Sequence, residues 1–174
     1  MEKIYLGIDN GATASIGVIG GPTPAAFHRP PIKKEPNYHK KASNISRIDF
    51  PAWLHYLQTI QALASLHGCP VFAVLEKPFT GMAHTAVLSG RVYEAEIIGL
   101  ETRQIPYTTI PSSDWQGTAK IPGLLPTGTK GSAACKRASA AAGVRLFPHL
   151  EADIKRHGDA DGLLIAEWAR RKNL

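Results

Sequence analysis

Ile4-Tyr5-Leu6-Gly7-Ile8-Asp9-Asn10-Gly11 is the stretch that decides the fold. Its apolar side chains follow one another without interruption, which is typical of a strand buried on both faces near the middle of a sheet. The acid at the end of this strand has two explanations. Asp9-Asn10-Gly11 is a good hairpin turn, because Asn and Gly tolerate positive φ. Acids gathered at one edge of a sheet also form a site for a hard divalent cation.

Three further acids favour the second explanation. Glu76 directly follows the apolar strand Val71–Leu75, while Asp159 and Asp161 lie at the start of the last predicted helix. Each acid also has a purely structural interpretation. Glu76 can be a solvated charge at the end of a strand, and the two aspartates can cap a helix, which is worth about 1 kcal/mol.

The order of predicted elements indicates a mixed α/β fold. Strands are expected at residues 4–8, 14–19, 25–28, 71–75 and 107–110, which gives a five-stranded sheet with an antiparallel beginning. Helices are expected from an Asp49 cap to Gly68, over residues 85–103, from Thr129 to Gly143, and at the end of the chain. The prolines of residues 29–47 argue against regular structure there, and residues 117–129 are predicted to form a loop.

Length and composition set limits on the class of protein. The 174 residues fit one domain spanning residues 1–174, and the formal net charge of +6 favours a polyanionic partner such as nucleic acid. Many soluble proteins are equally basic without that role. The apolar runs are too short to cross a membrane, so we expect no membrane association and a cytoplasmic location. Cys69 and Cys135 have no metal-site or disulfide spacing.

Basic side chains concentrate in the proline-rich segment of residues 29–47. Lys33, Lys34, Lys40 and Lys41 surround an aromatic pair at residues 38–39. Such a segment can follow a phosphate backbone and stack on a base, or it can be a solvated flap without a partner. The sequence leaves both interpretations open.

Three motifs taken together resemble a known family. Gly7–Gly11, Val74–Pro78 and Ala160–Ala166, the last followed by Arg170 and Arg171, resemble the ribonuclease H-like nucleases, and most closely the phage versions of the RuvC-type Holliday junction resolvases. The resemblance spans nearly the whole chain. It implies a homodimer in a bacterial or phage-infected cell that resolves four-way DNA junctions by two Mg²⁺-assisted nicks. It further implies that Asp9 bridges two metal ions while Glu76 and Asp161 each hold one of them.

The fourth metal ligand departs from the family pattern. The family places it about one turn before the position matched to Asp161, where this chain has Gly158. If a helix already runs there, His157 shares the face of Asp161; if Gly158 belongs to a loop, Asp159 can turn inward. We favour His157 as the ligand, with Asp159 kept as a candidate catalytic residue. An imidazole ligand would make Mn²⁺ a possible alternative to Mg²⁺.

The resemblance also indicates contacts with DNA. Phe79 can stack on an unpaired base, while Lys130, Lys136 and Arg137 can contact phosphates. For Phe79, a place in the core is the alternative. The helix over residues 85–103 has apolar positions that suit either a dimer contact or the core of the monomer.

Three other functions compete with junction resolution. Residues 7–11 also look like the first phosphate loop of the actin and sugar-kinase ATPases, but those proteins need a second comparable domain. A nuclease acting on RNA or RNA–DNA hybrids would keep the same acids. A non-catalytic junction-binding module is the alternative from another class.

Overall fold

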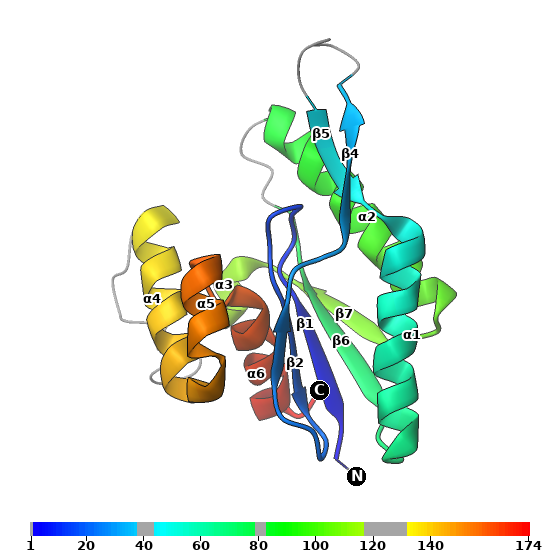
Figure 1. The fold of residues 1–174 in the computed structure, drawn as a ribbon, viewed down its shortest axis with the longest axis vertical. Helices are drawn as coiled ribbons and strands as arrows, with labels where there is room; N and C mark the ends of the chain where they lie inside the picture. The colour runs from blue at the N-terminus through cyan, green and yellow to red at the C-terminus, as the bar shows by residue number, and fades with distance from the viewer. Residues whose placement is uncertain (1, 38–43, 79–82, 117–131) are drawn as a thin grey trace.

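The computed structural model describes residues 2–37, 44–78, 83–116 and 132–174. A five-stranded sheet with the order β3-β2-β1-β6-β7 forms its centre (Figure 1). The strands are β1 (Ile4–Ile8), β2 (Ile16–Gly20), β3 (Ala26–His28), β6 (Val71–Glu76) and β7 (Tyr107–Ile110). The first three strands pair antiparallel, whereas β1, β6 and β7 run parallel. This confirms the predicted mixed five-stranded α/β sheet.

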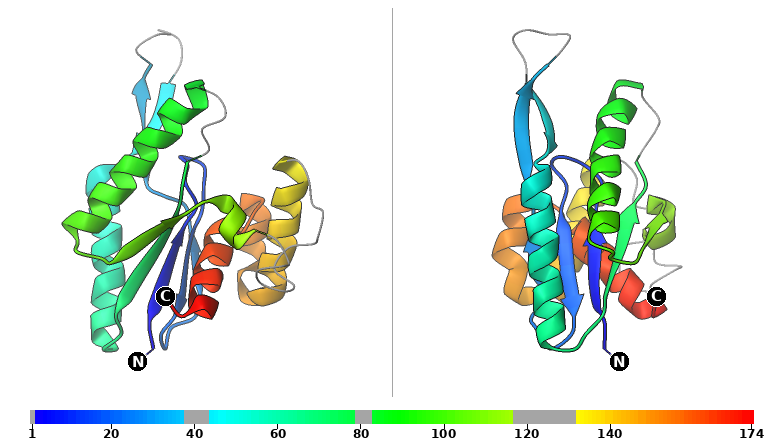
Figure 2. Two further views of the ribbon diagram at one scale, coloured as in Figure 1. Left: turned by 180° about the vertical axis from the view of Figure 1, so that it is seen from behind. Right: turned by 90° about the vertical axis from the view of Figure 1, so that its right-hand side faces the viewer.

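Helices cover both faces of the sheet (Figures 1 and 2). On one side lie α1 (Phe50–Leu66) and α2 (Ala83–Thr102); the other side carries α4 (Ser132–Leu146), α5 (Glu151–His157) and α6 (Asp161–Lys172). A four-residue helix α3 (Ser112–Trp115) follows β7, and a 3₁₀ turn (Pro148–Leu150) precedes α5. Each face has its own apolar cluster, around Ile4, Leu6 and Trp53 on the first side and around Leu163, Leu164 and Trp115 on the second. Within the described residues, no helix is long and apolar enough to span a membrane.

Helix α6 packs directly on the backbone of β1 and β2. Gly7 and Gly17 make this possible, because a Cβ on Gly7 would overlap backbone atoms of Gly162 and Ala166, and one on Gly17 would overlap Leu163. On the helix side, a Cβ on Gly162 would lie 2.6 Å from the Ser15 carbonyl oxygen. The missing side chains therefore fix how close the start of α6 comes to the end of β1.

We expect Gly7→Ala to destabilise the protein by about 2 kcal/mol, since overpacked core sites cost on the order of 1–3 kcal/mol. Gly90→Ala is the matched control. Gly90 lies within α2, and a Cβ added to it would meet nothing within 4 Å. Alanine there should therefore stabilise the protein by up to about 1 kcal/mol through helix propensity. Urea denaturation of the two variants measures both effects. Equal stability of the two variants would contradict the close packing of α6.

The segment of residues 29–47 differs from the prediction. Its described part contains a two-stranded antiparallel ribbon, β4 (Ile32–Pro36) and β5 (Asn44–Ile48), which lies beside α2 beyond the central sheet (Figure 1). Pro36 is tolerated because it is the last residue of its strand in a ribbon of two strands. Glu35 also links the strands through Arg47 of β5, which lies 2.7 Å from one of its carboxylate oxygens, and it pairs with Lys33 of its own strand at 3.0 Å.

One helix end and one additional helix also differ from the prediction, whereas the first helix starts as expected. The Asp49 side chain accepts a hydrogen bond from the Ala52 amide at 3.4 Å and so caps α1. Helix α4 continues past Gly143 to Leu146, and Gly143 is needed there because a side chain would overlap Ala160. The last predicted helix begins at Asp161 as α6, and the helix before it, α5, was not predicted; Gly158 takes the left-handed conformation (φ 99°) and ends α5.

Candidate active site

Three aspartates meet where β1 ends and α6 begins. Carboxylate oxygens of Asp9, Asp159 and Asp161 all lie within 4.8 Å of one another. Asp9 follows β1, and its amide donates to the Ser15 carbonyl oxygen at 3.0 Å. Asp161 is the first residue of α6, and Asp159 lies in the short link after α5. The close packing of α6 on β1 therefore brings together acids separated by about 150 residues. We call these three residues the aspartate cluster.

Two buried serines hold the link between α5 and α6. The Ser15 hydroxyl donates to Asp159 Oδ1 at 3.3 Å and accepts the Gly162 amide at 3.0 Å. The Ser139 hydroxyl donates to Asp161 Oδ1 and accepts the Ala160 amide at 3.0 Å. Each serine thus fixes one carboxylate and one backbone amide in the link or in the first turn of α6. Neither serine was predicted from the sequence, because a single serine in a loop or a helix carries no motif.

Lys136 is part of this site in the structure. Its Nζ lies 3.0 Å from Asp159 Oδ2, and Asp159 is almost fully buried while Lys136 remains about half exposed. The hydrogen bond to Asp159, together with the charges of Asp159, Asp161 and Asp9, raises the pKa of Lys136. Lys136 and Ser139 are three residues apart on α4 and so share one face of that helix. The lysine predicted to contact phosphate is therefore paired with the aspartate cluster in the structure.

Glu76 lies beside the cluster but outside the group of three. It is the last residue of β6, and its Oε2 accepts a hydrogen bond from Trp115 Nε1 at 2.8 Å. Burial raises the pKa of Glu76 to about 7, with a further contribution from the charge of Asp161, although the bond from Trp115 lowers it. Trp115 itself is fully buried. This tryptophan, also missed from sequence, thus fixes the orientation of the Glu76 carboxylate.

The aspartates oppose one another electrostatically. The pKa of Asp9 is raised well above its ordinary range, first by burial and then by the charges of Asp161, Glu76, Asp159 and Glu96. Burial and the charge of Asp159 raise the pKa of Asp161 to about 6, against the lowering effects of Ser139 and Lys136. Carboxylates held together despite burial and mutual repulsion form a donor set that suits a hard divalent cation. The residues present therefore fit Mg²⁺ or Mn²⁺.

A further acid approaches the site from α2. Glu96 is fully buried, and neither of its carboxylate oxygens has a hydrogen-bond partner in the described part of the chain. Burial raises the pKa of Glu96 well above its ordinary value. The loop after β1 contains a second unpaired group, since both side-chain amide atoms of Asn10 are buried without partners among the same residues. From sequence, Glu96 is one polar position on an amphipathic helix and gives no signal.

His157 touches the aspartate cluster from outside and is not one of its members. It is the last residue of α5, and its Nε2 lies 3.1 Å from the Ala14 carbonyl oxygen. A carbonyl only accepts, so Nε2 carries a hydrogen and donates. The other nitrogen, Nδ1, lies 3.1 Å from Asp159 Oδ1. Both ring nitrogens thus face protein atoms, and the continuous helix on which the argument for His157 depends is interrupted at Gly158.

The other predicted DNA-binding residues lie apart from the cluster or outside the described residues. Lys33 and Lys34 are exposed on β4, where Lys33 pairs with Glu35, and Arg137 is exposed on α4. Phe79, Lys40, Lys41 and Lys130 fall in residues 38–43, 79–82 and 117–131, which the structure does not describe.

The raised pKa values predict that Glu76→Gln stabilises the metal-free protein at neutral pH. The pKa of Glu76 is about 7 in the folded protein against an ordinary 4.5. Ionising it therefore costs folding free energy, a cost that is absent below pH 4.5 and complete above pH 7. Melting temperatures in EDTA should be equal for variant and wild type at pH 4, with the variant higher at pH 7. A wild type that is more stable than the variant at pH 7 would contradict the raised pKa of Glu76.

Comparison with known proteins identifies the fold. No protein-family model matches the sequence, and no curated protein sequence matches it. Solved structures do match. A structure of T. thermophilus RuvC in complex with a Holliday junction substrate is 13% identical with a TM-score of 0.55, and the match covers 98% of this chain and 96% of that one. A second Thermus thermophilus RuvC structure is 15% identical with a TM-score of 0.48 and the same coverage.

Proposed function

From the RuvC-like fold of this chain, we propose that it is a metal-dependent endonuclease that resolves four-way DNA junctions by paired nicks. The observation that carries the proposal is the aspartate cluster: three carboxylates within 4.8 Å, at the edge of the sheet where β1 meets α6. The solved structure with the same fold was obtained with a Holliday junction substrate. The net charge of +6 agrees with a polyanionic substrate.

The residues that would hold divalent cations are Asp9, Asp159 and Asp161, with Glu76 completing the set from β6. We assign Asp159 rather than His157 as a ligand, because only the aspartate belongs to the cluster. When bound, Mg²⁺ or Mn²⁺ would lower the pKa of an attacking water and neutralise charge on the scissile phosphate. Trp115, Ser15 and Ser139 keep the carboxylates in place.

Lys136 has a second task in this proposal. It neutralises Asp159 in the structure, through an ammonium group on a flexible and half-exposed side chain. A divalent cation held by Asp159 would replace this charge, and the ammonium could then turn to a phosphate oxygen of the substrate. Contacts of this kind hold a strand in position without reading its sequence.

Cleavage of labelled substrates tests the function directly. A synthetic four-way junction is compared with linear duplex, flap and RNA–DNA hybrid, each with Mg²⁺, with Mn²⁺ and with EDTA. We expect metal-dependent paired nicks in the junction alone. Preferred cleavage of the hybrid would instead indicate a ribonuclease H-like activity. Tight junction binding without cleavage in either metal would indicate a non-catalytic binding module.

Paired nicks on opposed strands require two active sites, and a symmetric homodimer supplies them. Helix α2 offers a contact surface: Val87 is 57% and Ile98 44% exposed, while Val92 is buried in the core. Val87 and Ile98 are eleven residues apart, which is three helical turns, so they lie on the same side of α2.

We therefore expect Val87→Glu and Ile98→Glu to convert a dimer to a monomer without unfolding it. Light scattering measures the mass, and circular dichroism checks the fold. Leu66→Glu is the control, since Leu66 is 78% exposed at the end of α1. A wild type that is monomeric and still makes paired nicks would refute the dimer.

A further inference from the structure

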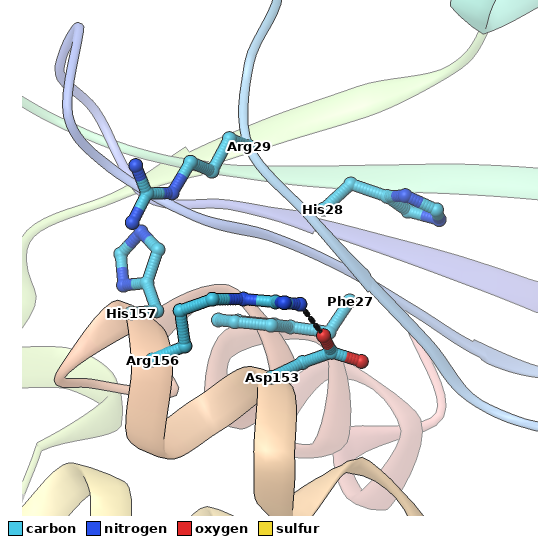
Figure 3. A pocket seen from close by; sticks show the side chains of 6 residues that line it. All are labelled: Phe27, His28, Arg29, Asp153, Arg156 and His157. Carbon is cyan, nitrogen blue, oxygen red and sulfur yellow. Dashed lines mark hydrogen bonds and ion pairs between the residues drawn. The ribbon is translucent and has the colours of Figure 1, made fainter.

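A basic pocket opens between the end of β3 and helix α5, on the far side of His157 from the aspartate cluster. Its volume is about 280 Å³. It is lined by Phe27, His28, Arg29, Asp153, Arg156 and His157. Figure 3 shows Arg29 reaching toward the His157 ring from the strand side, while Arg156 extends along α5 beside Asp153. Two guanidinium groups from different elements thus border one space.

The charge of this pocket comes from its two arginines. Arg29 is exposed, and the described residues give it no ion-pair partner. Arg156 pairs with Asp153 one turn earlier on α5, but both side chains are largely exposed, at 77% and 42%. Exposed pairs of this kind are weak and exchange readily for a stronger partner. Desolvation lowers the pKa of His28 despite the charge of Asp153, so the arginines dominate at neutral pH.

The His157 ring separates this pocket from the aspartate cluster. Its side chain is 4% exposed, and its Nδ1 lies 3.1 Å from Asp159 Oδ1. Phe27 supports the ring in an edge-to-face arrangement, with centroids 5.3 Å apart. A group bound in the pocket would therefore be about one side chain away from Asp159.

The proposed function requires negatively charged DNA to approach a cluster of acids, and the position of the pocket helps to offset the resulting repulsion. The acids at the cluster repel a phosphodiester backbone, and a bound cation offsets this repulsion only locally. A strand that presents one phosphate to the cluster must carry neighbouring phosphates across the surface beside it. Guanidinium groups suit such phosphates, since they bind two oxygens at once through parallel hydrogen bonds.

We propose that this pocket, through Arg29 and Arg156, binds a backbone phosphate that neighbours the scissile phosphate on the same DNA strand. The inference rests on the proposed function and extends it to a site that no sequence motif marks. Asp153 competes with this phosphate for Arg156. The two arginines and the aspartate therefore have opposite effects on DNA binding.

Junction binding over a salt series tests the pocket. Fluorescence anisotropy of a labelled four-way junction is measured with Ca²⁺ in place of Mg²⁺, for Arg29→Gln, Arg156→Gln and Asp153→Asn. Each arginine variant should bind about tenfold more weakly, as expected for one charged hydrogen-bonded contact, and its slope of log K against log salt should fall by about 1. Asp153→Asn should bind about threefold more tightly, since it removes a weak exposed competitor.

Lys155→Gln is the matched control. Lys155 is an exposed cation on the same helix that pairs with Glu151 and does not line the pocket. If the arginine variants bind no worse than this control, or Asp153→Asn weakens binding, the pocket does not hold a phosphate although the nuclease assignment stands. If the wild type binds no junction at all, the proposed function fails and the role of the pocket fails with it. Melting temperatures confirm that each variant is folded.

Discussion

Asp9→Asn should abolish metal-dependent cleavage while making the metal-free protein more stable. The variant loses a carboxylate that belongs to the aspartate cluster, and we expect the cleavage rate to fall by about a thousandfold or more, as for the loss of a central electrostatic contact. In the absence of metal, the same change removes the group whose pKa is raised by burial and by four neighbouring acids. Each ~1 kcal/mol of repulsion relieved should raise the melting temperature by about 3 °C.

The two measurements are a single-turnover cleavage assay and thermal melting in EDTA. Glu94→Gln is the control, because it removes an exposed acid from α2 by the same chemical change. Glu94→Gln should change neither the cleavage rate nor the melting temperature. Asp9→Asn with unchanged cleavage would remove Asp9 from the site, and a lower melting temperature in EDTA would show that the carboxylate stabilises the fold.

Lys136→Met should bind divalent cations more tightly and yet cleave more slowly. Methionine keeps much of the length of lysine but not its charge. A divalent metal ion therefore no longer competes for Asp159 with an ammonium group that lies 3.0 Å away. Removing a directly paired charge is expected to raise metal affinity about tenfold. At saturating metal, the phosphate contact that Lys136 supplies in our proposal is lost, and the rate should fall by about a hundredfold.

Calorimetry with Mg²⁺ gives the affinity independently of activity. Arg145→Met is the control, since Arg145 is an exposed cation in the last turn of the same helix, α4. Lower metal affinity in Lys136→Met would mean that the lysine supports the metal site rather than competing with the metal. Tighter metal binding with full activity would limit Lys136 to its role as a counter-ion.

The framework of the fold could be predicted because its signals are local. The apolar runs of β1 and β6 and the capped start of α1 depend on short stretches of sequence, and the structure confirms them. The β4–β5 ribbon was missed since prolines usually exclude strands, a rule that fails at the end of an edge strand.

The details of the site depend on tertiary packing and were less predictable. Glycine after His157 is a common signal for the end of a helix, and it would have placed Asp159 in a link rather than on a helix. By contrast, nothing local could show that Ser15, Ser139 or Trp115 would reach a carboxylate. Those contacts exist only because distant elements meet at the edge of the sheet.

The contact of α6 with β1 also determines when the site can form during synthesis. Asp9 is made about 150 residues before its partners in the cluster, which lie after α5 and at the start of α6. A chain that is still being made lacks those partners, and contacts between such distant residues close late in folding. Until then, the glycine-lined face of β1 and β2 stays uncovered. We therefore expect the aspartate cluster to be the last part of the protein to assemble, so an incomplete chain would lack the proposed cleavage activity.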